Sequence, residues 1–164
     1  MKLTTYLFLL IGFNQLYSQN VSLGQLTEWQ KTNYKIVENE LLKIGWKKGK
    51  TEKSEDIYRN DKYFLNKGSE NEKVLTLMYR TDYKLENNSL SYNAVKSYDY
   101  DNFIESLKSS GYKKFKSKNG NVISDYYRSD KLTVITSVLK GIDEFKFITI
   151  YLCTNEEYPK SHRE

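Results

Sequence analysis

The chain has 164 residues, and its 26 Lys and Arg against 21 Asp and Glu give a formal net charge of +5. This modest positive charge permits contact with polyanions without requiring it. The one cysteine, Cys153, excludes an intramolecular disulfide, and its apolar surroundings in the sequence favour a core role over a nucleophilic one. The one histidine, His162, lies close to the C-terminus and is badly placed for a Ser/His or Cys/His site.

Residues 1–19 have the pattern of a signal peptide. Lys2 supplies a positive charge, and the apolar stretch 3–13 that follows is shorter than the ~20 residues that a membrane-spanning helix needs. We expect cleavage after Ser18 or Gln19, a secreted or periplasmic location, and no membrane anchor on the mature protein. The alternatives are a permanent anchor and a buried first helix.

The rest of the chain contains two segments that resemble each other. Residues 34–48 match residues 100–114, and residues 58–62 match residues 127–131 further on. The insertions that this alignment requires fall in predicted loops. That favours an internal duplication over a chance similarity between lysine-rich segments.

Each matching segment begins with a predicted helix. Apolar side chains recur at helical intervals in residues 34–44 and 100–107, which indicates an amphipathic helix in each. The sequence Ser22–Gln25 has the form of a capping box ahead of the first helix. Gly45 and Gly111 stand where a left-handed residue commonly ends a helix.

Predicted strands follow each helix. They are separated by turn formers such as Asn60-Asp61 and Ser129-Asp130. Residues 90–95 allow a short extra strand between the two sets. The predicted strands are 56–59, 62–65 and 73–80 after the first helix, and 122–128, 132–139 and 144–153 after the second.

The sequence therefore predicts an α+β fold of two tandem helix-β-β-β units, in which antiparallel meander sheets pack against the helices. We expect the first unit at residues 20–82, a connector at 83–98, the second unit at 99–153 and a flexible tail at 154–164.

Tandem helix-plus-meander units on an exported chain resemble in outline the bacterial β-lactamase inhibitory proteins. Those proteins carry two repeated α/β units and bind an enzyme across a concave sheet. The resemblance is limited to architecture, because no motif of that family is present and no residue role carries over.

The sequence offers no motif for a metal or for a phosphate group. One Cys and one His leave only carboxylates as metal ligands, and the glycines occur singly. We therefore expect no metal, no cofactor and no enzymatic activity. A small hydrolase that uses two of the acidic residues is a less favoured alternative.

Lysine groups follow both predicted helices, and each precedes a Tyr-Arg pair. Tyrosine and arginine are favoured interface anchors, and lysines neutralise anionic polymers. The simpler interpretation is that the lysines solvate loops and that Arg59 and Asp61 belong to a turn. The candidate binding residues are Lys47, Lys48, Lys113, Lys114, Tyr58, Arg59, Tyr127 and Arg128.

Together these features favour an exported, non-catalytic interaction protein that binds another protein, an inhibitor or immunity role included. The alternative is a binder of an anionic polymer or glycan, in which the lysines neutralise charge and the tyrosines stack on rings. The sequence does not identify the partner.

Overall fold

The computed structural model describes residues 21–54, 58–69, 71–80, 89–95, 100–140, 146–156 and 158. Within them the chain forms one 8-stranded antiparallel sheet and three helices, α2 (Leu23–Lys31), α3 (Tyr34–Lys43) and α4 (Tyr100–Ser109). The strands are β1 (Lys47–Ser54), β2 (Tyr58–Leu65), β3 (Lys73–Arg80), β4 (Ser89–Val95), β5 (Lys113–Lys118), β6 (Val122–Arg128), β7 (Leu132–Lys140) and β8 (Lys146–Thr154). The predicted signal peptide and its cleavage site lie outside the described residues.

The helix boundaries follow from local capping. Ser22 and Gln25 form the predicted capping box, but this box begins a separate helix, α2, and the side chain of Asn33 caps α3. The predicted helix ends are confirmed, because Gly45 and Gly111 adopt φ values of 91° and 83°. After each of these helices the same pair of hydrogen bonds forms between the terminating backbone and the last helical turn.

The prediction of two tandem helix-β-β-β units is wrong. The strands follow the order β1-β2-β3-β4-β8-β7-β6-β5 in a single sheet, so each half of the chain contributes four strands, and β4 joins the halves by pairing with β8. The predicted connector contains β4. We define the first half as residues 34–95 and the second half as residues 100–154.

The lysine groups lie in strands, which corrects their assignment to loops. β1 and β5 contain four lysines each and form the two edges of the sheet. Alternation of apolar residues did not reveal these strands because neither has an apolar face. Lysine is a frequent residue of edge strands, where its charge opposes pairing with another chain.

β2 is one continuous strand, whereas a turn was predicted at Asn60-Asp61. Asp61 is fully buried in the middle of β2, and its carboxylate accepts a hydrogen bond from the Thr51 hydroxyl of β1 at 2.6 Å. The polar partner on the next strand therefore allows an aspartate, normally a turn residue, to remain within the sheet.

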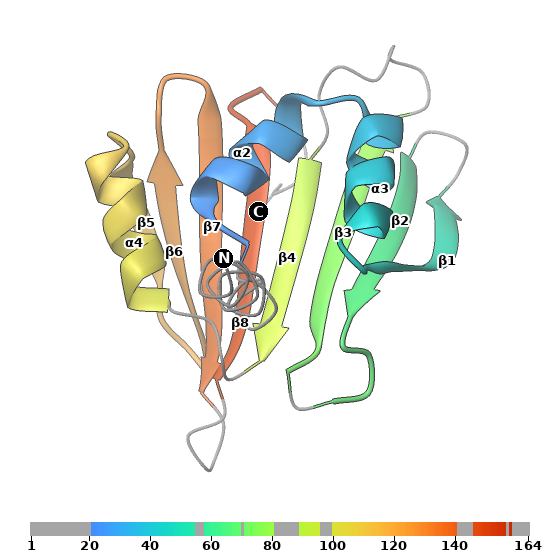
Figure 1. Ribbon diagram of the computed structural model, residues 1–164. Coiled ribbons are helices and arrows are strands. Elements are labelled where there is room, and N and C mark those ends of the chain that lie inside the picture. Colours follow the sequence, from blue (N-terminus) through green and yellow to red (C-terminus); the bar gives the residue numbers. More distant parts are fainter. Residues whose placement is uncertain are drawn as a thin grey trace, which may run out of the picture.

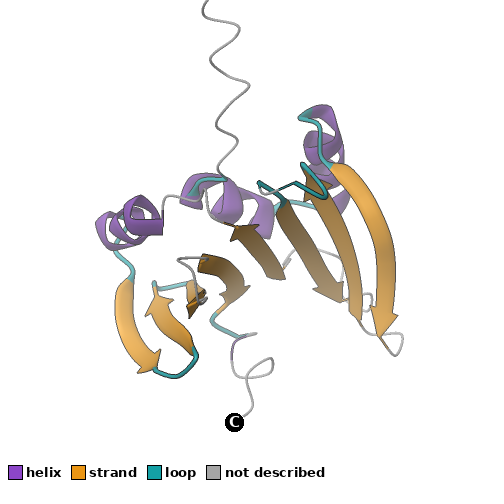
Figure 2. Ribbon diagram, turned by 90° about the horizontal axis from the view of Figure 1, so that it is seen from below, coloured by secondary structure: helices purple, strands orange, loops and turns teal. Residues whose placement is uncertain are grey.

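The two faces of the sheet are covered differently. All three helices lie on one face (Figures 1 and 2), and the strands send their largest apolar side chains into this layer. In β3 and β4, buried side chains such as Leu75, Leu77, Leu90 and Tyr92 alternate with half-buried ones. The half-buried side chains form the opposite face, which α2, α3 and α4 leave uncovered and which is called the bare face below.

Candidate functional site

The centre of the bare face is uncharged among the described side chains. It is formed by β3, β4, β8 and β7, and we call it the floor. Ser124 and Ser137 share a hydrogen bond of 2.8 Å across β6 and β7, and the Thr149 hydroxyl donates to Asn93 at 2.7 Å across β8 and β4. Half-buried side chains of the floor include Val74, Thr76, Ser91, Asn93, Thr149 and Tyr151.

An aromatic cluster lies on the bare face at the β5–β6 edge. The rings of Phe115, Tyr126 and Tyr158 make edge-to-face contacts, with centroids 5.9–6.2 Å apart. The register of β5 against β6 shifts at Phe115, so Phe115 and Lys116 both lie opposite Tyr126. The Arg128 guanidinium lies 4.4 Å from the Phe115 ring centroid and 5.4 Å from that of Tyr158.

The segment after β8 covers this end of the bare face. The backbone N–H of Asn155 donates to the Lys131 carbonyl, and its side-chain amide donates to the carbonyls of Ser129 and Asp130. The fully buried Thr133 donates its hydroxyl to the Asn155 side chain at 2.8 Å. Part of the predicted flexible tail, residues 154–156 and 158, thus makes defined contacts, whereas His162 lies outside the described residues.

Lys48 of the first lysine group is ion-paired on the helix-covered face. Its ammonium contacts Glu38 of α3 and lies 3.5 Å from the buried Asp61 carboxylate. Burial acts to raise the pKa of Asp61, but hydrogen bonds from Thr51 and Arg59 and the charge of Lys48 outweigh it and lower that pKa. The pKa of Glu38 is lowered in the same way, by Lys48 and by the Tyr63 hydroxyl, against the opposing effect of burial.

Lys114 of the second lysine group has the same kind of partner. Its ammonium lies 2.8 Å from Asp125 of β6, which also accepts a hydrogen bond from the Ser117 hydroxyl at 2.6 Å. Burial opposes ionisation of Asp125, but the bonds from Lys114 and Ser117 lower its pKa. Lys48 and Lys114 are therefore parts of ion pairs that link an edge strand to the strand beside it.

The two Tyr-Arg pairs do not occupy equivalent positions. Tyr127 lies opposite Lys114 on the sheet, whereas Lys48 lies opposite Tyr63, so the predicted equivalence of Tyr58 with Tyr127 is wrong. Tyr127 is 3% exposed, and burial with the nearby Asp125 charge raises its pKa to about 12. Tyr58 begins β2, and its side chain lies outside the described part of the structure.

Arg59 and Arg128 lie on opposite faces of the sheet. The Arg59 side chain lies on the helix-covered face, where it donates to the buried Asp61 at 3.2 Å. Arg128 is exposed on the bare face beside the aromatic cluster. Of the four Tyr and Arg candidates, Arg128 therefore has the setting expected for a contact residue.

The lysine groups are far apart. β1 and β5 are the first and last strands in the sheet order, which separates them by roughly 33 Å at ~4.8 Å per strand spacing. That distance exceeds the Debye length of about 10 Å at 0.1 M salt. Lys47 and Lys113 therefore do not form one cationic patch.

One groove, of about 400 Å³, lies between α2 and α4. Leu23, Phe103 and Tyr112 line it together with hydroxyl groups, and the described lining has no charged side chain. Its Thr27 and Ser106 hydroxyls already donate to backbone carbonyls of their own helices. The groove therefore offers apolar contact and few free donors.

Two kinds of feature, a metal site and a membrane-spanning helix, are absent from the described residues. No group of three or more His, Cys, Asp and Glu side chains is arranged there to hold a metal ion. None of the described helices combines the length and apolar character needed to cross a membrane.

No protein-family model, curated protein or solved structure matches this chain. The outline resemblance to the β-lactamase inhibitory proteins therefore gains no support from these comparisons.

Sequence reasoning selected Arg128 but missed the floor around it. The floor residues alternate with core residues in β3, β4 and β8, and that alternation is visible in the sequence. Alternation alone does not show which face the helices cover, so the bare face could only be identified from the folded arrangement.

Proposed function

We propose that this chain is an exported, non-catalytic interaction protein that binds another protein across the bare face of its sheet. One observation carries the proposal. The bare face combines an uncharged floor, in which polar side chains such as Ser91 and Thr149 lie beside apolar ones such as Val74 and Phe147, with an arginine held between aromatic rings at its side. Charged residues are depleted at the centre of protein interfaces, where aromatic residues and Arg are enriched, and antibody contact loops also use Ser and Asn.

The matched ion pairs of the two halves support a further part of the proposal, namely that the halves arose by duplication. Lys48 and Thr51 have the same spacing as Lys114 and Ser117, and they contact Asp61 as Lys114 and Ser117 contact Asp125. Export remains a proposal that rests on the N-terminal sequence. An inhibitor or immunity role is one form that protein binding would take.

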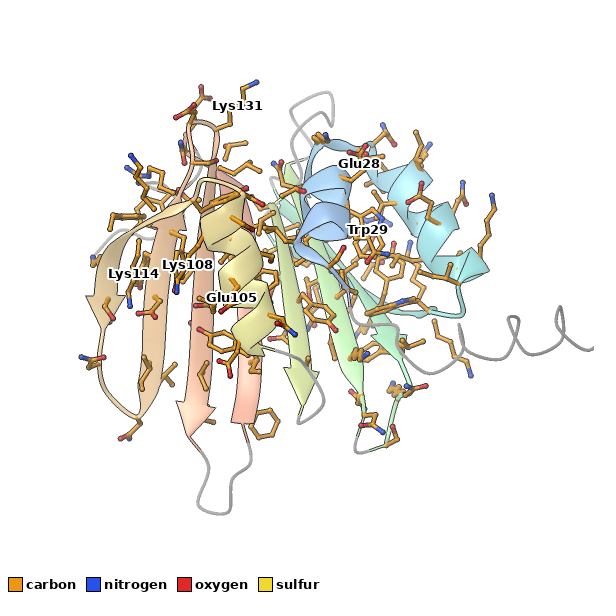
Figure 3. All side chains as sticks on the ribbon, turned by 60° about the vertical axis from the view of Figure 1, so that its left-hand side comes forward. Glu28, Trp29, Glu105, Lys108, Lys114 and Lys131 are labelled. Carbon is orange, nitrogen blue, oxygen red and sulfur yellow. The ribbon has the colours of Figure 1, made fainter. Side chains whose placement is uncertain are left out.

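Site-specific photo-cross-linking in the producing cells tests the proposal. p-Benzoylphenylalanine replaces Ser91 or Thr76 on the floor, or the exposed Glu105 on α4 as a matched control (Figure 3). We expect a defined protein adduct from the floor positions and none from Glu105. Adducts from Glu105 with none from the floor would contradict the proposal.

The second candidate is binding of an anionic polymer or glycan, favoured by the cations beside the rings of Phe115, Tyr126 and Tyr158. The separation of the two lysine groups and the ion pairs of Lys48 and Lys114 count against it. Salt distinguishes the candidates. Polymer affinity falls steeply with ionic strength, whereas a protein interface changes mainly in its association rate.

A further inference from the structure

The charges of the bare face are distributed unevenly. Across β5 and β6 the bare face carries Lys113, Lys116, Lys118 and Arg128, which we call the cationic rim. At the opposite edge the exposed Lys47 lies on the bare face across from Phe64, and Lys62 is paired with Glu52 at 2.8 Å. The described bare face is therefore an uncharged floor with cations at both edges, and the cationic rim is the larger group.

Arg128 is the cation of the rim that lies between two aromatic rings. Two rings flank its guanidinium, which restricts the side chain before any partner arrives. Among the described residues no carboxylate lies within ion-pair distance of it, whereas Arg59, Lys48 and Lys114 each have one. The exposed acids Asp130 and Glu156 lie in the β6–β7 turn and after β8. A planar guanidinium held in this way presents paired donors that fit a carboxylate.

We infer that the partner is a protein whose contact surface carries an acidic patch beside a neutral ridge, with the acidic patch against the cationic rim and the ridge on the floor. The inference rests on the proposed function and adds the chemistry of the partner. The Arg128 guanidinium, held between Phe115 and Tyr158, donates hydrogen bonds to a carboxylate of the partner. Lys113 and its neighbours accelerate association through their charge.

Selection from a phage-displayed library of random peptides on the purified protein tests this inference. We expect the selected peptides to be enriched in Asp and Glu. Their affinity should fall about tenfold or more for Arg128→Gln, because a desolvated carboxylate would lose its partner. Arg128→Lys keeps the charge but loses the planar donors, and we expect it to recover only part of the affinity. Lys108→Gln, an exposed lysine of α4, is the charge-matched control and should leave the affinity unchanged.

Two outcomes would overturn the inference. One is a set of selected peptides without acidic enrichment, or with equal affinity for wild type and for Arg128→Gln. The other concerns retention of the protein on a heparin column. An equal decrease in retention for Lys113→Gln and for Lys108→Gln would indicate general attraction to a polymer. Circular dichroism of each variant verifies that the fold is intact. Cross-linking at Ser91 tests the proposed function separately, because it depends on which face is contacted and not on the charge of the partner.

Discussion

Asp61 and Asp125 make matching contacts in the two halves of the sheet. Each accepts a 2.6 Å hydrogen bond from a hydroxyl on the neighbouring edge strand, and each lies beside a lysine of that strand. Both side chains lie on the helix-covered face. The two aspartates therefore link the lysine-rich edge strands to the neighbouring strands through side chains, in addition to the backbone hydrogen bonds of the sheet.

Asp61→Asn should destabilise the protein more than Asp125→Asn. The Asp61 side chain is 0% exposed, against 18% for Asp125. We expect losses in unfolding free energy of about 2–3 kcal/mol and about 1 kcal/mol respectively, since hydrogen bonds to charged groups weaken with solvation. Urea denaturation followed by fluorescence of the buried Trp29 and Trp46 measures both. Glu28→Gln, an exposed control, should change the free energy by less than about 0.5 kcal/mol; equal effects for all three variants would contradict the prediction.

Stability should fall in acid because the pKa values of Glu38, Asp61 and Asp125 are lowered in the folded state. Their contribution is complete above the unfolded pKa values of about 4 and is lost as the pH falls through the lower folded values. At the alkaline end, the folded pKa of Tyr127 is raised to about 12. Its contribution is complete below about 10 and is lost as the pH rises through the folded value.

Urea midpoints between pH 2 and pH 12 test this dependence. We expect a plateau from about pH 5 to about pH 9.5, with a decline on each side. A double Asp61→Asn, Asp125→Asn variant should show a smaller acid decline than the wild type. An acid decline of equal size in both proteins would mean that other groups cause it.

The Phe64 ring leaves no room for a side chain at position 49 of β1. A Cβ built on Gly49 would lie 2.3 Å from Cε2 of the Phe64 ring. We expect Gly49→Ala to cost about 1–3 kcal/mol, because the ring must move off β1. In a Phe64→Ala background the same change should be neutral or stabilising. Gly24→Ala in α2 meets no such contact and should stabilise by about 0.5–1 kcal/mol; additive free energies for the Gly49 and Phe64 changes would contradict the proposed contact.

Asn155 should be the most important residue of the segment after β8. Its side chain bonds to Thr133, Ser129 and Asp130, and the Thr133 hydroxyl is fully buried. We expect Asn155→Ala to cost about 2 kcal/mol, since it leaves a buried hydroxyl without this partner. Urea denaturation measures the loss, and Asn71→Ala, in the exposed β2–β3 turn, is the control. A loss no larger than that of Asn71→Ala would show that the segment does not hold the β6–β7 turn.

The sequence was most informative where local chemistry determines the structure. α3 and α4 were predicted from their apolar spacing, and their ends from Gly45 and Gly111, because helix formation and termination depend on neighbouring residues. β6 and β7 were predicted nearly to their observed bounds for the same reason, since a clear turn at Ser129 separates them.

The sequence was least informative where a tertiary partner determines the structure. β1 and β5 were predicted to be loops because lysines occupy both of their faces. Only their pairing with β2 and β6 makes them strands. Asp61 was predicted to lie in a turn because two of the groups that stabilise its buried carboxylate, the Lys48 ammonium and the Thr51 hydroxyl, come from another strand. Among the candidate site residues, Tyr127 and Arg128 are neighbours in the sequence but face opposite sides of the sheet, and only the register of β6 reveals which one is exposed.

The lysines of the edge strands should keep the protein monomeric. β5 is an edge of the sheet, and Lys113 and Lys118 are exposed on it. An edge strand offers unpaired backbone groups to other chains, and lysine opposes that pairing by charge and by the cost of burying it. We expect Lys113→Val with Lys118→Val to cause concentration-dependent self-association, because valine favours strand pairing.

Size-exclusion chromatography with light scattering measures this association. Lys35→Leu with Lys108→Leu, on the exposed surfaces of α3 and α4, removes the same charge and adds apolar surface away from any strand edge. This control should remain at the mass of the wild type. Self-association of the helix variant to the same extent would attribute the effect to net charge or added apolar surface, and the edge lysines would then have no protective role specific to β5.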